Sequence, residues 1–274
     1  MFNSKLDNLT IIIVTFRSRK VIFRNLLNIK NIKNVMILDN SNDFELKKVV
    51  RKKYKNIKFF TSKKNLGYAE GNNFLLKKTI TDYVLILNPD CLVSENEILK
   101  AYNFIKLMKN KCAILGSSDE AKILKKGTVF SKEYYLCDYI KGFFMICDVK
   151  IIKKLNFFDS KFFLYLEEID LCKRVRKKNF QVIGLRKIKI KHLAGKSSSD
   201  RREFKRLQNW HWMWSRFYYF NKHYGNLLSY IIFTPNLILS FLKTKIFKNN
   251  IKYNMRYHGL YNSMMKKKSF YRGK

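Results

Sequence analysis

Apolar and polar positions divide the first 90 residues of this chain into short runs that alternate with longer amphipathic stretches. Four runs rich in β-branched or aromatic residues have the length of strands: residues 9–16, 35–38, 57–61 and 83–87. Helices are expected over residues 20–29 and 44–54, and over a third stretch that ends near residue 78. Because continuous apolar runs are typical of parallel strands buried on both faces, the alternation predicts an α/β domain with a mainly parallel sheet and covering helices.

Polar side chains follow three of these predicted strands. The fourth run ends in Asn88-Pro89-Asp90, where Pro89 ends the strand and presents Asp90 from a stiff turn. Thr15-Phe16-Arg17 and Asp39-Asn40 follow the first two runs. Ligands of open α/β sheets bind at the carboxyl ends of strands, and these side chains can hydrogen-bond a nucleobase, a ribose and a diphosphate. The pattern favours a nucleotide site, and the alternative for Asp90 is a cap on the following helix.

The second half of the chain departs from this alternation. Residues 138–146 are predicted to form one strand, and the most acidic stretch, Glu167-Glu168-Ile169-Asp170, begins a predicted helix. On a helix, Glu167 and Asp170 share a face and Glu168 points elsewhere. Asp170 is spaced for a surface ion pair with Arg174, and acids at a helix N-terminus also complement its dipole. Two further strands are expected, and the second ends at His192, which by itself is more typical of a surface histidine than of a metal ligand.

Composition describes the surroundings of the protein more than its chemistry. The 274 residues carry a formal net charge of +37, which suits a nucleic acid or an anionic membrane surface, but the lysines are spread along the chain. Five cysteines without a Cys-x-x-Cys pair are expected to be reduced and buried, which favours a cytoplasmic location. No signal peptide is expected. No segment is expected to span a membrane, because Thr234-Pro235-Asn236 interrupts the nearest one, Leu227 to Leu242.

The order of these motifs resembles family 2 glycosyltransferases, and most closely their rhamnosyltransferase and galactofuranosyltransferase branch. The motifs are Thr15-Phe16-Arg17, Asp39-Asn40-Ser41, Asn65-Leu66-Gly67-Tyr68-Ala69, Leu87-Asn88-Pro89-Asp90, Gly142, Phe158-Asp159, Phe162-Phe163-Leu164-Tyr165, Glu167-Glu168-x-Asp170-Leu171 and His192. The similarity extends from about Leu9 to Ser199. It implies a GT-A (Rossmann-like) fold, an inverting hexosyltransferase-type reaction, a dTDP- or UDP-sugar donor and a divalent cation, Mn²⁺ or Mg²⁺.

The resemblance also implies roles for individual residues. Asp90 lies at the position of the family's metal-binding Asp-x-Asp motif, in which Asn88 here replaces the first carboxylate, and His192 lies at the position of a downstream metal ligand. Glu168 lies at the position of the general base, usually an aspartate, and Glu167 and Asp170 are further catalytic candidates. Donor-binding residues are expected to be Thr15, Phe16, Arg17, Asp39, Asn65, Gly67, Asn73 and Asn88.

Residues 200–274 lie beyond the resemblance, so the chain is expected to divide into a catalytic domain at 1–199 and a helical extension at 200–274. Aromatic residues at helical spacing, such as Trp210 and Trp214, begin the extension, and the apolar stretch Leu227 to Leu242 is followed by basic residues. This composition suits a segment in the membrane interface. The protein is therefore expected to lie at the cytoplasmic face of the membrane.

Together these features predict a glycosyltransferase that adds a sugar to a saccharide or lipid-linked acceptor during surface polysaccharide synthesis. A nucleic-acid-binding α/β protein is the first alternative, but the acidic cluster at residues 167–170 would repel a phosphate backbone, so no nucleic acid is expected as a partner. A sugar nucleotidyltransferase is the second alternative. It would show a glycine-rich turn after the first strand, whereas no glycine precedes Gly67.

Overall fold

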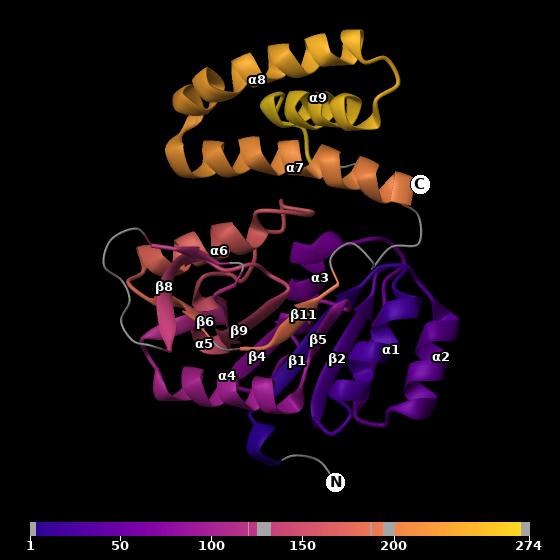
Figure 1. Ribbon diagram of the computed structural model, residues 1–274, viewed down its shortest axis with the longest axis vertical. Coiled ribbons are helices and arrows are strands. Elements are labelled where there is room, and N and C mark those ends of the chain that lie inside the picture. The colour runs from indigo at the N-terminus through magenta and orange to yellow at the C-terminus, as the bar shows by residue number, and fades with distance from the viewer. Residues whose placement is uncertain (1–3, 120, 125–132, 187, 194–200, 270–274) are drawn as a thin grey trace. The chain divides into compact units, whose positions relative to one another are not determined.

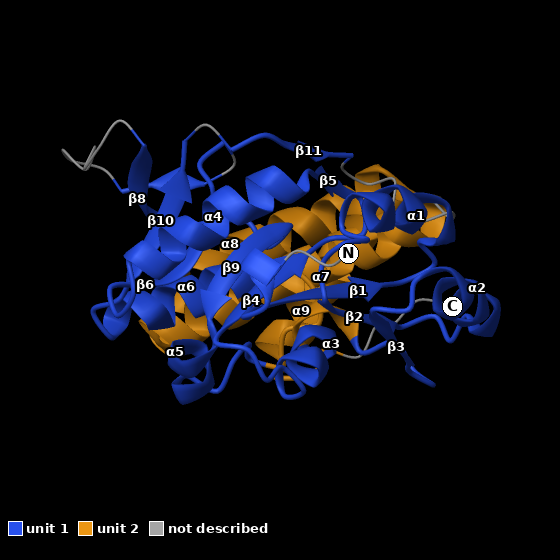
Figure 2. Cartoon of the chain, turned by 90° about the horizontal axis from the view of Figure 1, so that it is seen from below, with its two compact units in different colours: residues 1–66, 70–159, 168–199 blue, residues 67–69, 160–167, 200–274 orange. Residues whose placement is uncertain are grey.

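The computed structural model describes residues 4–119, 121–124, 133–186, 188–193 and 201–269 (Figure 1). The chain forms two compact units, which Figure 2 shows in blue and orange. We call residues 1–66, 70–159 and 168–199 the sheet unit, and residues 67–69, 160–167 and 200–274 the helical unit. The expected boundary at residue 199 lies where the long segment of the helical unit begins, while two short segments from earlier in the chain, 67–69 and 160–167, also belong to that unit.

The sheet unit contains most of the helices and all of the strands that the structure describes. Its strands are β1 (Leu9–Thr15), β2 (Asn34–Asp39), β3 (Ile57–Thr61), β4 (Tyr83–Leu87), β5 (Cys91–Val93), β6 (Cys112–Ser117), β7 (Lys122–Ile123), β8 (Tyr134–Tyr139), β9 (Phe144–Asp148), β10 (Gln181–Leu185) and β11 (Ile190–His192). A 3₁₀ turn at Ser4–Leu6 precedes the helices α1 (Arg19–Asn28), α2 (Phe44–Lys53), α3 (Gly67–Leu76), α4 (Glu95–Leu107), α5 (Val149–Lys154) and α6 (Glu167–Lys177). α3 and α6 begin with residues that belong to the helical unit.

The main sheet has nine strands in the order β3-β2-β1-β4-β9-β6-β10-β8-β7. β3, β2, β1 and β4 are parallel neighbours, as the alternation of strands and helices predicts. β9 runs antiparallel to both β4 and β6, and β10 is again parallel to β6. The apolar runs of β1 and β4 are buried along almost their whole length, so the prediction of strands covered on both faces is confirmed.

The prediction of one strand over residues 138–146 is wrong. The segment contributes to two strands, since β8 pairs with β10 while β9 lies between β4 and β6. The chain leaves one part of the sheet and re-enters another between Tyr139 and Phe144. An apolar pattern does not distinguish these arrangements, because both bury the same residues.

The helical unit contains α7 (Arg201–Tyr224), α8 (Asn226–Ile246) and α9 (Ile251–Met264), which confirms the predicted helical C-terminal region. Its core is a cluster of buried apolar residues from all three helices: Met213, Phe217, Phe233, Leu260 and Met264. α9 approaches α7 closely at Gly259, where an added Cβ would lie 2.1 Å from the carbonyl oxygen of Trp210. A residue without a side chain is required at this crossing.

α8 corrects the expectation that Thr234-Pro235-Asn236 interrupts the apolar segment. The helix continues through Pro235 over 21 residues, most of them apolar. By length and composition alone, α8 could cross a membrane. The sequence had predicted that no segment is long enough to do so. Proline removes one backbone donor and disfavours a helix interior, yet this helix is continuous, with the buried Phe233 two residues before the proline.

Candidate active site

Three of the polar strand ends meet at one edge of the sheet, as the sequence predicts. β2, β1 and β4 are adjacent and parallel, and Thr15 lies directly opposite Asp39 in the β1–β2 register. Because parallel strands end at the same edge, residues 15–17, 39–41 and 88–90 are brought together. This edge is where α/β folds bind ligands.

The ends of β1 and β2 are tied together by hydrogen bonds. The Asn40 amide donates to the Thr15 carbonyl oxygen at 2.8 Å. Asp39 is fully buried, and its carboxylate accepts from the Ser41 hydroxyl and from the Asp43 amide, each at 2.7 Å. Both carboxylate oxygens of Asp39 therefore hold the loop after β2. The predicted contact of Asp39 with a nucleotide-sugar donor stays a prediction. Among the described residues the buried hydroxyl of Thr15 has no hydrogen-bond partner, an arrangement that costs about 1–3 kcal/mol.

Arg17 adopts a left-handed backbone conformation with φ of 52°, which is uncommon outside glycine. Its amide donates to the Ser41 hydroxyl at 3.2 Å, and its guanidinium lies 5.1 Å from the centre of the Phe16 ring. The side chain of Arg17 is exposed. A positively charged side chain therefore lies at this edge of the sheet.

The turn after β4 is held in place by its backbone. The Asn88 amide donates to the Phe143 carbonyl at 2.9 Å, and the Asn88 carbonyl accepts from the Asn25 side chain at 2.9 Å. Asp90 follows and is 3% exposed. The alternative interpretation of Asp90 as a helix cap is excluded, since Ser94 caps α4 and its hydroxyl accepts from the backbone of Glu97.

His192 lies beside Asp90, although the two residues are far apart in the sequence. β5 and β11 pair antiparallel, His192 lies opposite Cys91, and the Leu193 amide donates to the Asp90 carbonyl at 3.0 Å. The distance from His192 Nε2 to Asp90 Oδ1 is 3.5 Å. The imidazole also stacks on Phe143, with 4.6 Å between ring centres. The tertiary structure therefore brings together the two residues expected to hold a cation.

This pair fits a divalent cation. Two ligands at about 2.1 Å from one ion and at right angles lie about 3 Å apart, so a small movement from 3.5 Å would let Asp90 and His192 share an ion. A carboxylate oxygen suits Mg²⁺ and Mn²⁺, and an imidazole nitrogen is a ligand of transition-metal ions. The described residues contain no group of three or more histidine, cysteine or acidic side chains placed for a metal. Water or phosphate oxygens would have to complete the coordination.

The acidic helix start places its three carboxylates in different environments. Glu167 and Asp170 are buried, whereas Glu168 is partly exposed with its Oε2 atom shielded from solvent. Asp170 Oδ2 accepts from Arg174 Nε at 2.7 Å. The expectation of a surface ion pair is wrong, because Asp170 is 0% exposed and Arg174 only 19%. Helical spacing predicts that the two residues meet but does not show that other elements cover them.

Arg174 links this pair to another part of the sheet unit. Its two terminal nitrogens donate to the carbonyl oxygens of Leu155 and Phe157, each at 2.6 Å. Asp170 therefore orients an arginine that holds the chain after α5. This structural role makes Asp170 a weaker candidate for the base than Glu168, whose catalytic role stays a prediction.

The backbone just before α6 is strained, a feature that the sequence did not indicate. Tyr165 and Leu166 both have φ of 70°, and residues in this region cost about 1–3 kcal/mol each unless surrounding contacts impose the conformation. Within the helical unit, Ser215 of α7 donates to the Leu164 carbonyl at 2.8 Å, and Trp212 packs edge-on against Tyr165 at 5.8 Å. α7 therefore holds the segment that leads into Glu168.

The loop at residues 65–73 has structural constraints of its own. Gly67 has φ of 74°, and a Cβ there would lie 2.4 Å from the Phe163 carbonyl oxygen. The Asn73 side chain both donates to and accepts from the backbone of Phe158, at 2.9 and 3.0 Å. Asn73 thus clamps the chain at Phe158. The predicted donor contacts of Asn65, Gly67 and Asn73 stay predictions.

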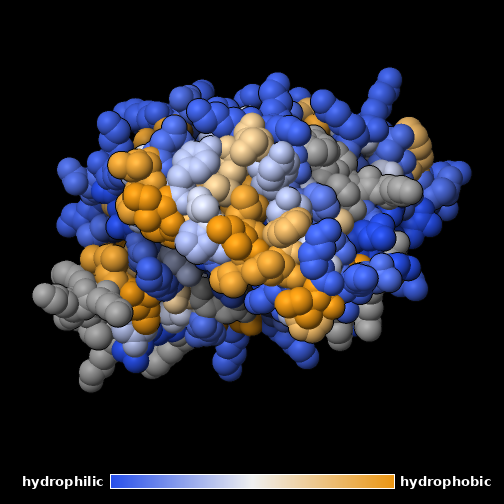
Figure 3. Space-filling model, turned by 90° about the horizontal axis from the view of Figure 1, so that it is seen from above, coloured by the Kyte–Doolittle hydropathy of each residue, from blue (hydrophilic) through white to orange (hydrophobic). Residues whose placement is uncertain are grey.

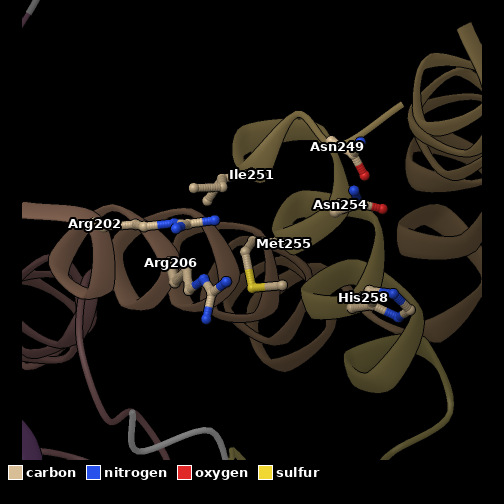
Figure 4. A pocket seen from close by; sticks show the side chains of 7 residues that line it. All are labelled: Arg202, Arg206, Asn249, Ile251, Asn254, Met255 and His258. Atoms are coloured by element: carbon tan, nitrogen blue, oxygen red, sulfur yellow. The ribbon is translucent and has the colours of Figure 1, made fainter. Parts of the chain in front are cut away.

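A cavity in the helical unit contains none of the predicted site residues. It lies between α7 and α9 and is lined by Arg202, Arg206, Asn249, Ile251, Asn254, Met255 and His258 (Figure 4).

Residues 10–171 match the family described as Glycosyl transferase family 2. The chain belongs to glycosyltransferase family 2. This family 2 glycosyltransferase is 26% identical over 199 residues to the low-salt glycan biosynthesis hexosyltransferase Agl10 of Haloferax volcanii, covering 65% of this chain and 64% of that protein. It is 24% identical over 182 residues to the rhamnosyltransferase WbbL of Escherichia coli, covering 53% of this chain and 67% of that protein. The match thus covers about two thirds of the length of WbbL and slightly less than two thirds of the length of Agl10.

Solved structures with a similar fold include two glycosyltransferases. The mannosyltransferase PcManGT from Pyrobaculum calidifontis, in complex with GDP-Man and Mn²⁺, has a TM-score of 0.61 at 10% identity, covering 95% of this chain and 88% of that chain. GalNAc-T7 with UDP, GalNAc and Mn²⁺ has a TM-score of 0.60 at 11% identity, covering 78% and 51%. At these identities the comparison shows the fold alone. The family 2 glycosyltransferase therefore has the GT-A fold that the resemblance implies.

Proposed function

We propose that this family 2 glycosyltransferase moves a hexose-type sugar, such as rhamnose, from a nucleotide-diphosphate donor to a saccharide or lipid-linked acceptor. The reaction inverts the anomeric centre and serves the synthesis of a surface polysaccharide. The observation that carries the proposal is the pairing of Asp90 with His192 at 3.5 Å, at the sheet edge that also carries Thr15 and Asp39.

The residues at this edge supply the groups that such a transfer needs. Asp90 and His192 would hold a divalent cation, which supplies positive charge opposite a departing diphosphate. The exposed guanidinium of Arg17 adds a second positive charge for the phosphates. The buried Thr15 hydroxyl, which has no hydrogen-bond partner among the described residues, lies at the end of β1 on the same edge.

Glu168 takes the proton from the acceptor hydroxyl in this proposal. The hydroxyl oxygen forms a bond to the anomeric carbon as the bond to the diphosphate oxygen breaks on the opposite side, and the proton passes to the Glu168 carboxylate. Attack from the opposite side inverts the configuration. The strained backbone at Tyr165 and Leu166 fixes how the chain enters the helix that carries this base.

Proteins similar to this chain support the proposed substrate classes. PcManGT was solved with GDP-Man and GalNAc-T7 with UDP, each with Mn²⁺, so nucleotide-diphosphate donors and Mn²⁺ are the first to test. Agl10 and WbbL are described as hexosyl- and rhamnosyltransferases. We keep dTDP- and UDP-sugars as the preferred donors and a saccharide or lipid-linked sugar as the acceptor.

The decisive experiment measures nucleotide binding with and without Mn²⁺ or Mg²⁺. Thermal unfolding of the full chain is followed with UDP, dTDP and GDP and with their sugar derivatives, because a ligand that binds the folded state raises the melting temperature by mass action. Asp90→Asn and His192→Ala should each lose the cation-dependent part of the increase. Asp7→Asn, at an exposed carboxylate in the same unit, is the matched control and should behave as wild type.

Two results would contradict the proposal. Full cation-dependent nucleotide binding by both variants would show that Asp90 and His192 hold no ion. Failure of every nucleotide to shift the wild-type melting temperature, with or without a cation, would remove the nucleotide site itself.

A further inference from the structure

α8 of the helical unit carries apolar side chains on two opposite faces. Its inner face carries Phe233, which is buried among the helices of the unit, and the buried polar residue Ser229 lies on the same face. Its outer face carries Leu227, Ile231, Ile238, Leu242 and Ile246, all of them exposed. At 100° per residue these five positions lie within about 100° of one another. We call them the α8 stripe.

The α8 stripe is the opposite of what a water-facing surface requires. A surface helix of a soluble protein turns charged and polar residues outward, whereas Ile231 is 61% exposed and Ile238 is 54% exposed. Figure 3 shows this face from above, where hydrophobic side chains gather along α8. Single exposed apolar residues such as Ile80 and Leu107 in the sheet unit need no explanation. Several exposed apolar residues along one helix face mark a surface that something apolar covers.

The charge of this region indicates an anionic partner. No aspartate or glutamate follows Glu203 in the sequence, whereas 14 lysines and arginines do. Lys243 and Lys245 lie in the last turn of α8, and Lys248 follows it. An apolar stripe that ends in lysines is the composition of helices that lie in the interface of an anionic membrane.

The cavity between α7 and α9 lies at this basic end of α8. Residues 247–250 join α8 to α9, and Asn249 and Ile251 line the cavity. Figure 4 shows Arg202 and Arg206 of α7 among the side chains that line the cavity, together with Ile251 at the start of α9. Arg206 lies 3.8 Å from Glu203, the last acid of the sequence. Guanidinium groups here add donors for lipid phosphates.

Two other ways to cover the α8 stripe fit less well. A second copy of this chain would bring a second basic end against the first, without acidic residues after Glu203 to pair with either. A spanning orientation would remove α8 from its bundle. Phe233 packs against Phe217 with ring centres 5.6 Å apart, and the Tyr230 hydroxyl donates to the Met264 carbonyl. These contacts would be lost.

We propose that the helical unit is a membrane-docking module in which α8 lies parallel to an anionic bilayer. The α8 stripe enters the boundary between headgroups and acyl chains, and the cations at the end of α8 and around the cavity contact lipid phosphates. The inner face of α8 keeps its packing, so the helix does not cross the bilayer. The anionic cytoplasmic leaflet provides such a surface. Membrane docking requires neither the nucleotide-sugar donor nor the sugar acceptor. It can therefore be tested independently of the transfer reaction.

Binding of the purified full chain to vesicles tests the apolar part of this proposal. Vesicles of phosphatidylcholine alone are compared with vesicles that contain 30% phosphatidylglycerol, a composition chosen at roughly the anionic content that attracts basic segments. Wild type should bind the anionic vesicles. Ile231→Glu combined with Ile238→Glu should weaken binding at least about tenfold. Ile80→Glu combined with Leu107→Glu makes the same change at exposed sites of the sheet unit and should bind as wild type.

Two double lysine variants, one in α8 and one in α2, test the contribution of positive charge to vesicle binding. Lys243→Gln with Lys245→Gln should weaken binding to anionic vesicles by about fivefold for each lysine near the surface, and high salt should have the same effect. Lys48→Gln with Lys52→Gln removes the same charge from the exposed face of α2 and should have little effect.

The orientation of α8 can be measured with fluorescent labels. All five native cysteines are buried, so a cysteine introduced at Leu227, Ile238 or Ile246 is labelled selectively. Quenching by lipids that carry a quencher at known depths should place all three labels at the same shallow depth.

Four outcomes would overturn the proposal. The first is absence of vesicle binding by wild type, and the second is wild-type binding by the Ile231→Glu, Ile238→Glu variant. The third is a label at Ile238 near the bilayer centre with both helix ends shallow, which indicates a spanning helix. The fourth is a stable dimer in light scattering that the same two substitutions dissociate while vesicle binding is unchanged.

Discussion

Substituting Asp170 by asparagine distinguishes a structural carboxylate from a catalytic one. The substitution keeps the shape of the side chain and one acceptor oxygen, but it removes the charge that faces Arg174 at 2.7 Å. Because Asp170 is 0% exposed and Arg174 is 19% exposed, the guanidinium would remain largely buried without its counter-charge. We therefore expect Asp170→Asn to act on stability first.

The size of the effect follows from this burial. Breaking a buried pair by removing one partner costs about 3–5 kcal/mol, compared with about 0.3–0.5 kcal/mol for an exposed pair one helical turn apart. We expect about 3 kcal/mol, the lower end of the range, because Arg174 retains some exposure and its bonds to two carbonyl oxygens. For a domain of this size the melting temperature should fall by about 2–4 °C for each kcal/mol.

The assay combines urea unfolding, followed by circular dichroism, with a transfer measurement under conditions where each variant is folded. Glu168→Gln is the matched control on the same helix. It should unfold within about 0.5 kcal/mol of wild type and lose about 10²- to 10⁴-fold in transfer rate, since the general base is gone. Arg174→Gln combined with Asp170→Asn should cost less than the sum of the single variants, because each alone leaves a partner unpaired.

One pattern of results would refute this reasoning. If Asp170→Asn unfolds like wild type yet transfers no sugar, while Glu168→Gln retains its rate, then Asp170 is the base and its contact with Arg174 tunes catalysis instead of holding the fold.

Three further predictions concern other parts of the chain. Burial opposes ionisation of Glu97, but hydrogen bonds from Lys100 and from a backbone amide outweigh it and hold the pKa of Glu97 below its ordinary value of 4.5. Glu97→Gln should therefore reduce the free energy of unfolding at pH 7, and the difference from wild type should disappear as the pH falls through the lowered pKa, as urea unfolding at a series of pH values would show. Gly259→Ala should destabilise the helical unit by about 1–3 kcal/mol, since its Cβ would meet the Trp210 carbonyl oxygen, and faster proteolysis of α7 and α9 would reveal it. Burial raises the pKa of Cys137 to about 11, so a thiol reagent at pH 8 should leave it unmodified until the protein is unfolded, as mass spectrometry can measure.

The placement of the site at one sheet edge could be predicted from the sequence because it depends on local pattern. Continuous apolar runs mark β1 and β4 as strands covered on both faces, and parallel strands necessarily end on the same side. Thr15, Asp39 and Asp90 therefore meet whatever the details of packing. The order of motifs around these residues was sufficient to indicate the family.

The pairing of Asp90 with His192 depended on tertiary structure. Its immediate cause is the short ladder between β5 and β11, which places His192 opposite Cys91. Three-residue strands carry almost no periodic signal, so the sequence alone did not show that the histidine reaches the carboxylate. Here the resemblance to a family, and not the residue pattern, suggested the partner.

What the sequence by itself determined is the set of features that arise within one element: which segments are strands, which are helices, and which polar residues follow them. Burial is different, because it depends on what other elements cover. Asp170 and Arg174 form the pair that helical spacing predicts, yet only the packed structure shows that it is buried. The segment before Glu168 is held by Ser215, a contact between residues far apart in the sequence. α8 continues through Pro235 although proline lacks a backbone donor and disfavours a helix interior, and the sequence pattern alone did not indicate this.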